Sequence, residues 1–233
     1  MPVIEQLNEI QLDALQETGN IGCSHAATAI SQMVSKQISI SVPTIKIKKI
    51  DELKATLQQI SGSNEKLVGV YLELTKDFLG SILFAFPYQS ALNLADVLMC
   101  QPPGTTKELD EMGKSARTEV GNIVVSAYTN ALGALLNTEV MLSPPTFAHD
   151  MPGAIIDNIL KTLGNATHAL IFDTQFKGEQ NLFTSYFVLL PSPQSLDALL
   201  GKLASKMCNG CSDAEMNAYI DSLSSNLENK KNG

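Results

Sequence analysis

Hydrophobic and polar positions along the chain alternate in two distinct periods. Ile38, Ile40 and Val42 recur with a period of two and predict a strand at 37–42. Strands are also predicted at 66–74 and 79–86 in the first half, and at 139–142, 167–173 and 182–190 in the second. Helical spacing predicts helices at 88–99 and 192–204, and a helix at 150–163, with Pro152 in its first turn, has a shorter partner near 51–60. Helices and strands are interspersed in both halves, so we expect an α/β or α+β fold with a pseudo-twofold axis.

The two halves also share residues. When 13–44 is placed over 115–146 at an offset of 102, ten of the 32 positions are identical, whereas random pairing would give about two. We therefore interpret the chain as an internal duplication with repeats at about 5–100 and 107–204, forming one domain over 1–205. Residues 206–233 have no copy and predict an appended amphipathic helix, capped by Ser212 and Glu215, with a tail. A structural role for this helix is favoured over a partner-binding one.

Composition excludes several classes of protein. The chain has 233 residues, 44% hydrophobic and 17% charged, with no apolar run long enough to cross a membrane. Its net charge of −8 and scattered basic residues argue against a nucleic-acid partner. Four cysteines and an N-terminus without an apolar signal core predict a reduced, cytoplasmic protein.

The familiar catalytic motifs are missing. His25, His149 and His168 lack ligand spacing, and the sequence contains no GxSxG, P-loop or GxGxxG motif. Cys208 and Cys211 form a single CxxC, which we interpret as an incidental pair of thiols rather than a metal or redox site. We therefore expect no metal site in this chain.

The duplication preserves a polar stripe. Asp13, Glu17 and Asn20 lie within an arc of about 60° on a helix, and Ser115, Glu119 and Asn122 repeat the spacing. About 120° around the first helix lies an apolar seam formed by Leu12, Leu15, Gly19, Cys23, Ala26, Ile30 and Met33. A solvated helix face is the simplest interpretation of the stripe. However, a solvated face gives no reason to keep both Glu and Asn while their neighbours diverge, so a functional role is equally plausible.

Glu and Asn suit a particular kind of chemistry. An amide is not a base at neutral pH, but it can hold a water molecule in line for attack, and a carboxylate can pair with a partner's lysine. Positioning of this kind is sufficient where the bond is already reactive, as in phosphoryl transfer. These residues therefore favour a phosphatase that acts on another protein's active site.

The motif D/S-x3-E-x2-N-x22-P occurs in both copies and resembles the signature of the CheC/CheX/FliY chemotaxis phosphatases, with Pro43 and Pro145 as its prolines. The resemblance covers about 5–205 and is greatest to the two-site CheC members. It implies a mixed sheet of about six strands that carries two long motif helices. Pro43 and Pro145 would end the first strand of each copy, a supporting role that Asp13 and Ser115 would share.

The resemblance also implies an activity. The chain would hydrolyse the aspartyl phosphate of the response regulator CheY: Glu17 and Glu119 would pair with the regulator's lysine, and Asn20 and Asn122 would orient the water. The regulator would supply Mg2+, and the chain would need no cofactor of its own. A second partner, the receptor deamidase CheD, would bind around Asp150, Gly153, Ala154 and Asp157, where a purely structural helix is at least as plausible. The alternatives are a non-catalytic module like the FliM switch domain, and a protein that mainly regulates CheD.

Overall fold

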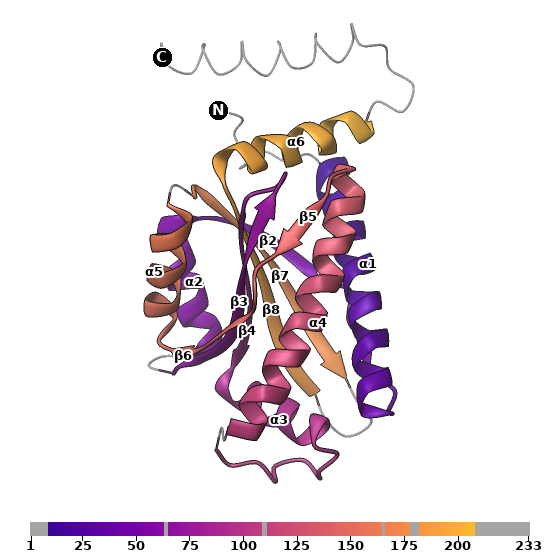
Figure 1. Cartoon of the computed structure of the whole chain (residues 1–233), viewed down its shortest axis with the longest axis vertical. Helices are drawn as coiled ribbons and strands as arrows, with labels where there is room; N and C mark the ends of the chain where they lie inside the picture. Colours follow the sequence, from indigo (N-terminus) through magenta and orange to yellow (C-terminus); the bar gives the residue numbers. More distant parts are fainter. Residues whose placement is uncertain (1–8, 63–64, 109–110, 165, 178–181, 208–233) are drawn as a thin grey trace, which may run out of the picture.

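The computed structural model describes residues 9–62, 65–108, 111–164, 166–177 and 182–207 (Figure 1). The first half of the chain forms α1 (Glu9–Val34), β1 (Ser39–Ile40), β2 (Thr44–Lys49), α2 (Ile50–Ser61), β3 (Leu67–Lys76), β4 (Gly80–Pro87) and α3 (Tyr88–Leu98). The second half forms α4 (Glu111–Leu136), β5 (Val140–Leu142), β6 (Thr146–Asp150), α5 (Pro152–Leu163), β7 (His168–Lys177), β8 (Leu182–Pro191) and α6 (Pro193–Met207).

The strands form one sheet in the order β1-β7-β8-β4-β3-β5, in which β2 also pairs with β7 and β6 also pairs with β3. The predicted fold class is confirmed, but the sheet is not mixed, because every strand pairing is antiparallel. Each half contributes a hairpin, β3–β4 or β7–β8, and strands joined by a hairpin are antiparallel. The sheet has eight strands rather than about six, since each edge of the sheet is divided into two strands.

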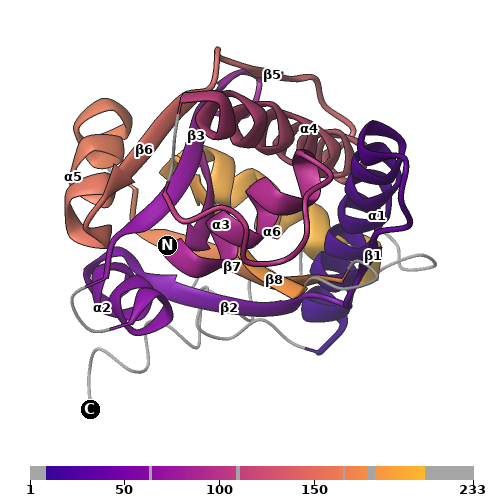
Figure 2. The same cartoon turned by 90° about the horizontal axis from the view of Figure 1, so that it is seen from below.

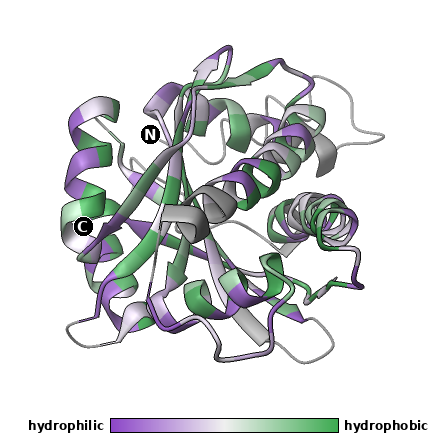
Figure 3. Ribbon diagram, turned by 60° about the horizontal axis from the view of Figure 1, so that its bottom comes forward, coloured by the Kyte–Doolittle hydropathy of each residue, from purple (hydrophilic) through white to green (hydrophobic). Residues whose placement is uncertain are grey.

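Helices cover both faces of the sheet, as Figure 2 shows from below. Side chains that alternate along the strands divide into two cores. One core, with Val70, Phe84, Phe172 and Phe187, packs against α1, α3, α4 and α6. The other core, with Leu83, Ile171 and Val188, packs against α2 and α5. The helices at the left of Figure 3 show the matching alternation of hydrophobic and hydrophilic residues, and α5 buries Ile155, Ile156 and Ile159.

The element order of the first half recurs in the second half. The bounds of α1 and α4 differ by 102 residues at both ends, from 9 to 111 and from 34 to 136, and the bounds of α2 and α5 do the same, from 50 to 152 and from 61 to 163. The predicted helix near 51–60 is therefore not shorter than its partner, since both have 12 residues. This correspondence supports the interpretation of the chain as two repeats.

The first strand predicted in the second half, at 139–142, is found as β5, but the one predicted in the first half is only partly formed. Only Ser39–Ile40 of the region 37–42 is a strand, and pairing with β7 resumes after Pro43. Pro145 stands at the same place before β6. Each proline follows the first strand of its half by three residues and directly precedes a second strand of the same edge, in keeping with the lack of an N–H that proline could donate to the ladder. The sequence analysis missed β2 and β6, although Ile45 and Ile47 alternate with Lys46 and Lys48 in β2.

The closing helix α6 runs past the predicted end of the domain at 205, to Met207. The predicted appended helix, with Ser212 and Glu215, and the thiols of Cys208 and Cys211 lie outside the described residues.

Candidate functional site

Helices α1 and α4 lie side by side on one face of the sheet (Figure 1). They run in opposite directions, and the end of α1 lies near the loop after α3, where the Cys100 thiol contacts the Val34 carbonyl oxygen. The two helices approach closely at Gly22, where an added Cβ would lie 3.0 Å from the Tyr128 Cα. This pairing places the two predicted Glu/Asn sets on neighbouring helices.

A buried polar cluster lies where α1, α4 and β7 meet. The Cys23 sulfur is 2.5 Å from the Tyr128 hydroxyl oxygen, which is 3.3 Å from the Thr174 hydroxyl oxygen. Burial raises the pKa of the Cys23 thiol, and burial together with Cys23 raises the pKa of Tyr128 well above its ordinary value. Both groups therefore stay protonated at neutral pH and act as hydrogen-bonding groups in the core rather than as nucleophiles.

The glycines of the two motifs bring each helix close to the sheet. A Cβ at Gly19 would lie 3.0 Å from the Phe172 ring, and a Cβ at Gly121 would lie 2.7 Å from Val70. Val70, Phe84, Phe187 and Phe172 are neighbours across four adjacent strands. The two helices are thus seated at the two ends of one row of side chains, and neither position has room for a larger residue.

The predicted apolar seam of α1 is confirmed along its centre. Leu15, Gly19, Cys23, Ala26 and Ile30 are buried. Leu12 and Met33 are 37% and 41% exposed, so their predicted burial is wrong. A helix of 26 residues is about 39 Å long, whereas a strand of ten residues spans about 33 Å, so the ends of α1 extend beyond the sheet.

The polar stripe faces away from these packing contacts. Asp13, Glu17 and Glu119 are exposed, and Asn20 and Asn122 are half-buried. Ser115 takes the position of Asp13 on α4, and its side chain lies outside the described residues. Within the described part of the chain, no hydrogen bond or ion pair involves the side chains of Glu17, Asn20, Glu119 or Asn122. Two carboxylates and two carboxamides are therefore available for contacts with another molecule.

A second set of residues fixes the strand beside each motif helix. The backbone N–H of Ser41 donates to the Gln175 carbonyl, and the Ser41 hydroxyl accepts the Gln175 N–H. Ser143 makes the same two bonds with Glu73. Ser41 and Ser143 were not among the residues that the sequence analysis selected as functional or structural candidates. The signal that could have found them is their identity at the offset of 102.

Pro43 links this strand to α1. Its ring would lie 3.1 Å from a Cβ at Gly19, and its carbonyl accepts a hydrogen bond from the Gln16 amide. Pro43 is buried and Pro145 is half-buried. The support expected from Pro43 is therefore mechanical, since it holds the turn of α1 that carries Asn20.

The region expected to bind CheD lies around α5, on the opposite face of the sheet from α1 and α4 (Figure 2). Asp150 and Asp157 are exposed, and Gly153 and Ala154 are half-buried. The Asp150 carboxylate accepts the Met151 N–H, and Asp157 pairs with Lys54 of α2. These residues form a second surface that is separate from the Glu/Asn sets.

Among the described residues, no group of three or more His, Cys, Asp or Glu side chains could hold a metal ion. A search of the same residues finds no helix that is both long and apolar enough to span a membrane.

The fold matches those of two solved structures, FliY and the FliM middle domain. The structure of Thermotoga maritima FliY matches with a TM-score of 0.70 at 21% identity, over 86% of this chain and 98% of that chain. The FliM middle domain from H. pylori matches with a TM-score of 0.58 at 9% identity, over 84% of this chain and 99% of that chain. At these identities the likeness shows the fold alone.

The sequence comparisons show the family. The profile of the CheC-like family matches residues 10–47, which include the first motif. The CheY-P phosphatase CheC of Bacillus subtilis is 30% identical over 212 residues, which cover 89% of this chain and all of the relative. The chain belongs to the CheC-like family.

Proposed function

We propose that this protein is a phosphatase that hydrolyses the aspartyl phosphate of the response regulator CheY in chemotaxis. The relative from Bacillus subtilis, similar along its whole length, is named a CheY-P phosphatase. The observation that carries the proposal is that Glu17/Glu119 and Asn20/Asn122 are identical pairs whose side chains make no hydrogen bond or ion pair within the described part of the chain. Other identical pairs, such as Gly19/Gly121 and Ser41/Ser143, have structural contacts that explain them.

In the proposed reaction, Asn20 or Asn122 enters the regulator's active site and orients a water molecule. The carboxamide oxygen accepts a hydrogen bond from the water, and this directs the water oxygen at phosphorus. The bond between phosphorus and the aspartyl oxygen breaks, which releases inorganic phosphate and the free carboxylate. An amide is sufficient for this role because an acyl phosphate is already reactive.

Glu17 and Glu119 are the proposed docking groups. Each precedes its Asn by three residues, so both side chains lie on one face of the helix. An exposed carboxylate there can form a charge-assisted hydrogen bond with a lysine of the regulator. Mg2+ would arrive with the regulator, where it neutralises charge on the phosphoryl oxygens. Such a reaction requires a protein that works in the cytoplasm.

The test is the decay rate of Mg2+-bound, phosphorylated CheY with wild-type protein and with Asn20→Ala, Asn122→Ala and the double variant. We expect the double variant to accelerate CheY dephosphorylation about 100-fold less than the wild-type protein. Each single variant should retain the activity of its one intact site. Asn158→Ala is the matched control, because Asn158 is an exposed asparagine on α5.

Two results would contradict the proposal. If wild-type protein binds the regulator without accelerating decay, the protein is a non-catalytic module like the FliM switch domain. If the double variant is as active as Asn158→Ala, another group performs the hydrolysis.

CheD regulation is a second candidate function, favoured by the separate surface at α5. Gly153 has open space around it, since an added Cβ there would meet no atom within 4 Å. We expect Asp150→Asn and Gly153→Trp to weaken CheD binding in a pull-down while leaving CheY dephosphorylation intact. Lys54→Ala controls for Asp157→Asn, because both variants remove the ion pair between α2 and α5; equal losses would assign Asp157 a structural role.

A further inference from the structure

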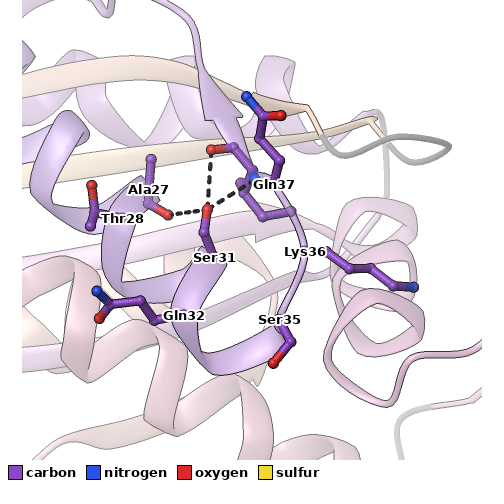
Figure 4. A pocket seen from close by; sticks show the side chains of 8 residues that line it. Ala27, Thr28, Ser31, Gln32, Ser35, Lys36 and Gln37 are labelled. Carbon is purple, nitrogen blue, oxygen red and sulfur yellow. Dashed lines mark hydrogen bonds between the residues drawn. The ribbon is translucent and has the colours of Figure 1, made fainter.

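Each motif helix ends beside a surface hollow. The first hollow has a volume of about 440 Å³ and lies between the last turns of α1 and the start of β1 (Figure 4). The second has a volume of about 500 Å³ and lies at the end of α4. Its lining residues, from Thr129 to Val140, are those of the first hollow, from Ala27 to Ile38, moved by 102 positions. The hollow therefore recurs with the motif.

The first hollow has a fixed floor and a polar rim. The Ser31 hydroxyl donates to the Ala27 carbonyl at 2.7 Å and accepts the Ile38 N–H at 2.9 Å, which joins the helix to the strand. Figure 4 shows Ser31 between these partners and Lys36 extending away from it. The Lys36 side chain is exposed and makes no ion pair with another described residue.

The hollow lies on the same face of α1 as Asn20. At 100° per residue, Ala27 and Ser31 lie within about 20° of Asn20, and the eleven residues from Asn20 to Ser31 span about 16 Å. A standard protein interface covers about 800 Å² on each partner, and a disc of that area has a radius of about 16 Å. A protein docked with its reacting group at Asn20 therefore reaches the hollow.

The two hollows differ in charge. Lys36 and Gln37 of the first correspond to Thr138 and Glu139 of the second, and Glu139 is paired with Lys76. The carboxylate and phosphate oxygens around a Mg2+-bound aspartyl phosphate make the regulator negative at the point where Asn20 docks. The hollow lies about 16 Å from that point, within the Debye length of about 30 Å at 0.01 M salt, so the Lys36 ammonium group is attracted at low salt and Thr138 is not.

We propose that the hollow between α1 and β1 is a docking site for the phosphorylated regulator, and that Lys36 sets the affinity of the Asn20 site through its attraction to the regulator's negative charge. This inference rests on the proposed function. A charge at the rim of an interface acts mainly on the association rate. Its removal should therefore change KM and Kd, and the change should become smaller as the salt concentration rises. The simplest competing role for Lys36 is a favourable charge at the C-terminal end of α1, which would change stability instead.

The test uses a background with one working site, Asn122→Ala. In that background, Lys36→Thr introduces the residue found at the matching position of the second hollow. We expect it to raise KM and the Kd for beryllofluoride-loaded regulator about 3–5-fold at low salt with kcat unchanged, and to lose this effect above about 0.5 M salt. Lys66→Thr removes the same charge from an exposed lysine at the start of β3, and should leave both constants unchanged. In the Asn20→Ala background, Thr138→Lys should lower KM.

The outcomes separate the two proposals. If Lys36→Thr and Lys66→Thr have the same Kd at low salt, the docking site is overturned, whatever the activity. If wild-type protein binds the loaded regulator without hydrolysing phosphate, the proposed phosphatase fails, and the Kd ratio still decides the role of Lys36. Absence of any binding overturns both.

Discussion

In the first half of the chain a Cβ at Gly19 would meet the Phe172 ring and the Pro43 ring, whereas in the second half the three atoms nearest to a Cβ at Gly121 all belong to Val70. The helices that carry these glycines have the same length and the same place relative to the sheet. The comparison shows that the backbone arrangement is common to both halves, while the side chains that fill the space beneath each helix are not. Residues that are identical in the two halves therefore mark positions where backbone packing or a partner molecule requires one residue type.

The helices that close the two halves differ more. Asp96 of α3 is buried, and its carboxylate accepts the N–H groups of Gly104 and Thr106 at 2.6 and 2.8 Å. Gly201 of α6, which matches Asp96 when Gln89-Ser90 is placed over Gln194-Ser195, has open space around it. Only α3 is followed by the segment that leads to a second motif helix, and Asp96 holds that segment in place.

The largest effect is expected from Asp96→Ala. The substitution leaves two N–H groups without their charged acceptor, so we expect a loss of about 3 kcal/mol in the free energy of unfolding, measured with urea. Asp197→Ala, an exposed position on α6, is the control. A loss equal to the control's would contradict the anchoring role of Asp96.

Asp96 also predicts an acid dependence. Burial raises the pKa of its carboxyl, but hydrogen bonds from Thr106 and Gly104 outweigh burial, so the pKa lies below the ordinary value of 3.8. A lowered pKa in the folded state stabilises the protein above the ordinary value, and this stability is lost as the pH falls through the folded pKa. Asp96→Asn should therefore reduce the loss of unfolding free energy below about pH 4. If the unfolding free energy of the variant falls with pH as steeply as that of the wild-type chain, Asp96 does not have the lowered pKa.

Glycine substitutions sharpen the comparison between α1 and α4. Gly121→Ala places a Cβ against the branched Val70 side chain on its strand, and we expect a loss of about 2 kcal/mol. A Cβ at Gly19 would lie 3.0 Å from the Phe172 ring and 3.1 Å from the Pro43 ring, less tight than the 2.7 Å at Gly121, so we expect Gly19→Ala to cost less, below about 1 kcal/mol. Gly201→Ala should stabilise α6 by up to about 1 kcal/mol. Urea unfolding of the three variants would contradict this account if Gly19→Ala were the most damaging.

The serines should behave alike. Ser41→Ala and Ser143→Ala each remove the acceptor of one strand N–H, and we expect each to cost about 1 kcal/mol. Ser39→Ala, at an exposed position on the same edge, should cost less. Unequal losses at the two equivalent serines would show that the edges of the sheet are not equivalent.

The smallest expected effect concerns alkaline pH. Because the pKa of the Cys23 thiol is raised above its ordinary value of 9.0, the unfolded chain loses this proton first. The stability from Cys23 is fully present below the unfolded pKa and is lost as the pH rises through the folded pKa. Cys23→Ala should therefore flatten the fall in unfolding free energy above about pH 9 relative to the wild-type chain. Parallel curves for the variant and the wild-type chain would contradict the account.

The sequence was a good guide wherever a local pattern and its repeat agreed. Hairpin strands such as β3 and β4 were predicted directly from their hydrophobic runs, because both faces of these strands are covered. The Glu and Asn candidates stood out because they recur at the offset of 102 beside diverged neighbours. The edge strands β2 and β6 were not predicted from the sequence, since a half-exposed strand can carry lysine or histidine and still pair with its neighbouring strand.

The roles of identical residues could not be separated before the fold was known. Gly19, Asn20 and Ser41 are equally preserved in the second half, yet Gly19 is required by the Phe172 ring and Ser41 by the Gln175 N–H. Asn20 has no such partner among the described residues. Contacts between residues more than a hundred positions apart decide these roles, and spacing along one helix carries no information about them.

By itself, the sequence determined the repeat, the class of fold, and the stripe of polar residues on each motif helix, because these depend on periodicity within a single element. The tertiary structure decided which of the preserved residues make packing contacts or hydrogen bonds within the described part of the chain and which remain available for a partner molecule. It also decided that a hollow follows each stripe, with Lys36 beside one and the Glu139–Lys76 pair beside the other. These features depend on how two helices and two sheet edges meet in space, and that is settled by long-range packing.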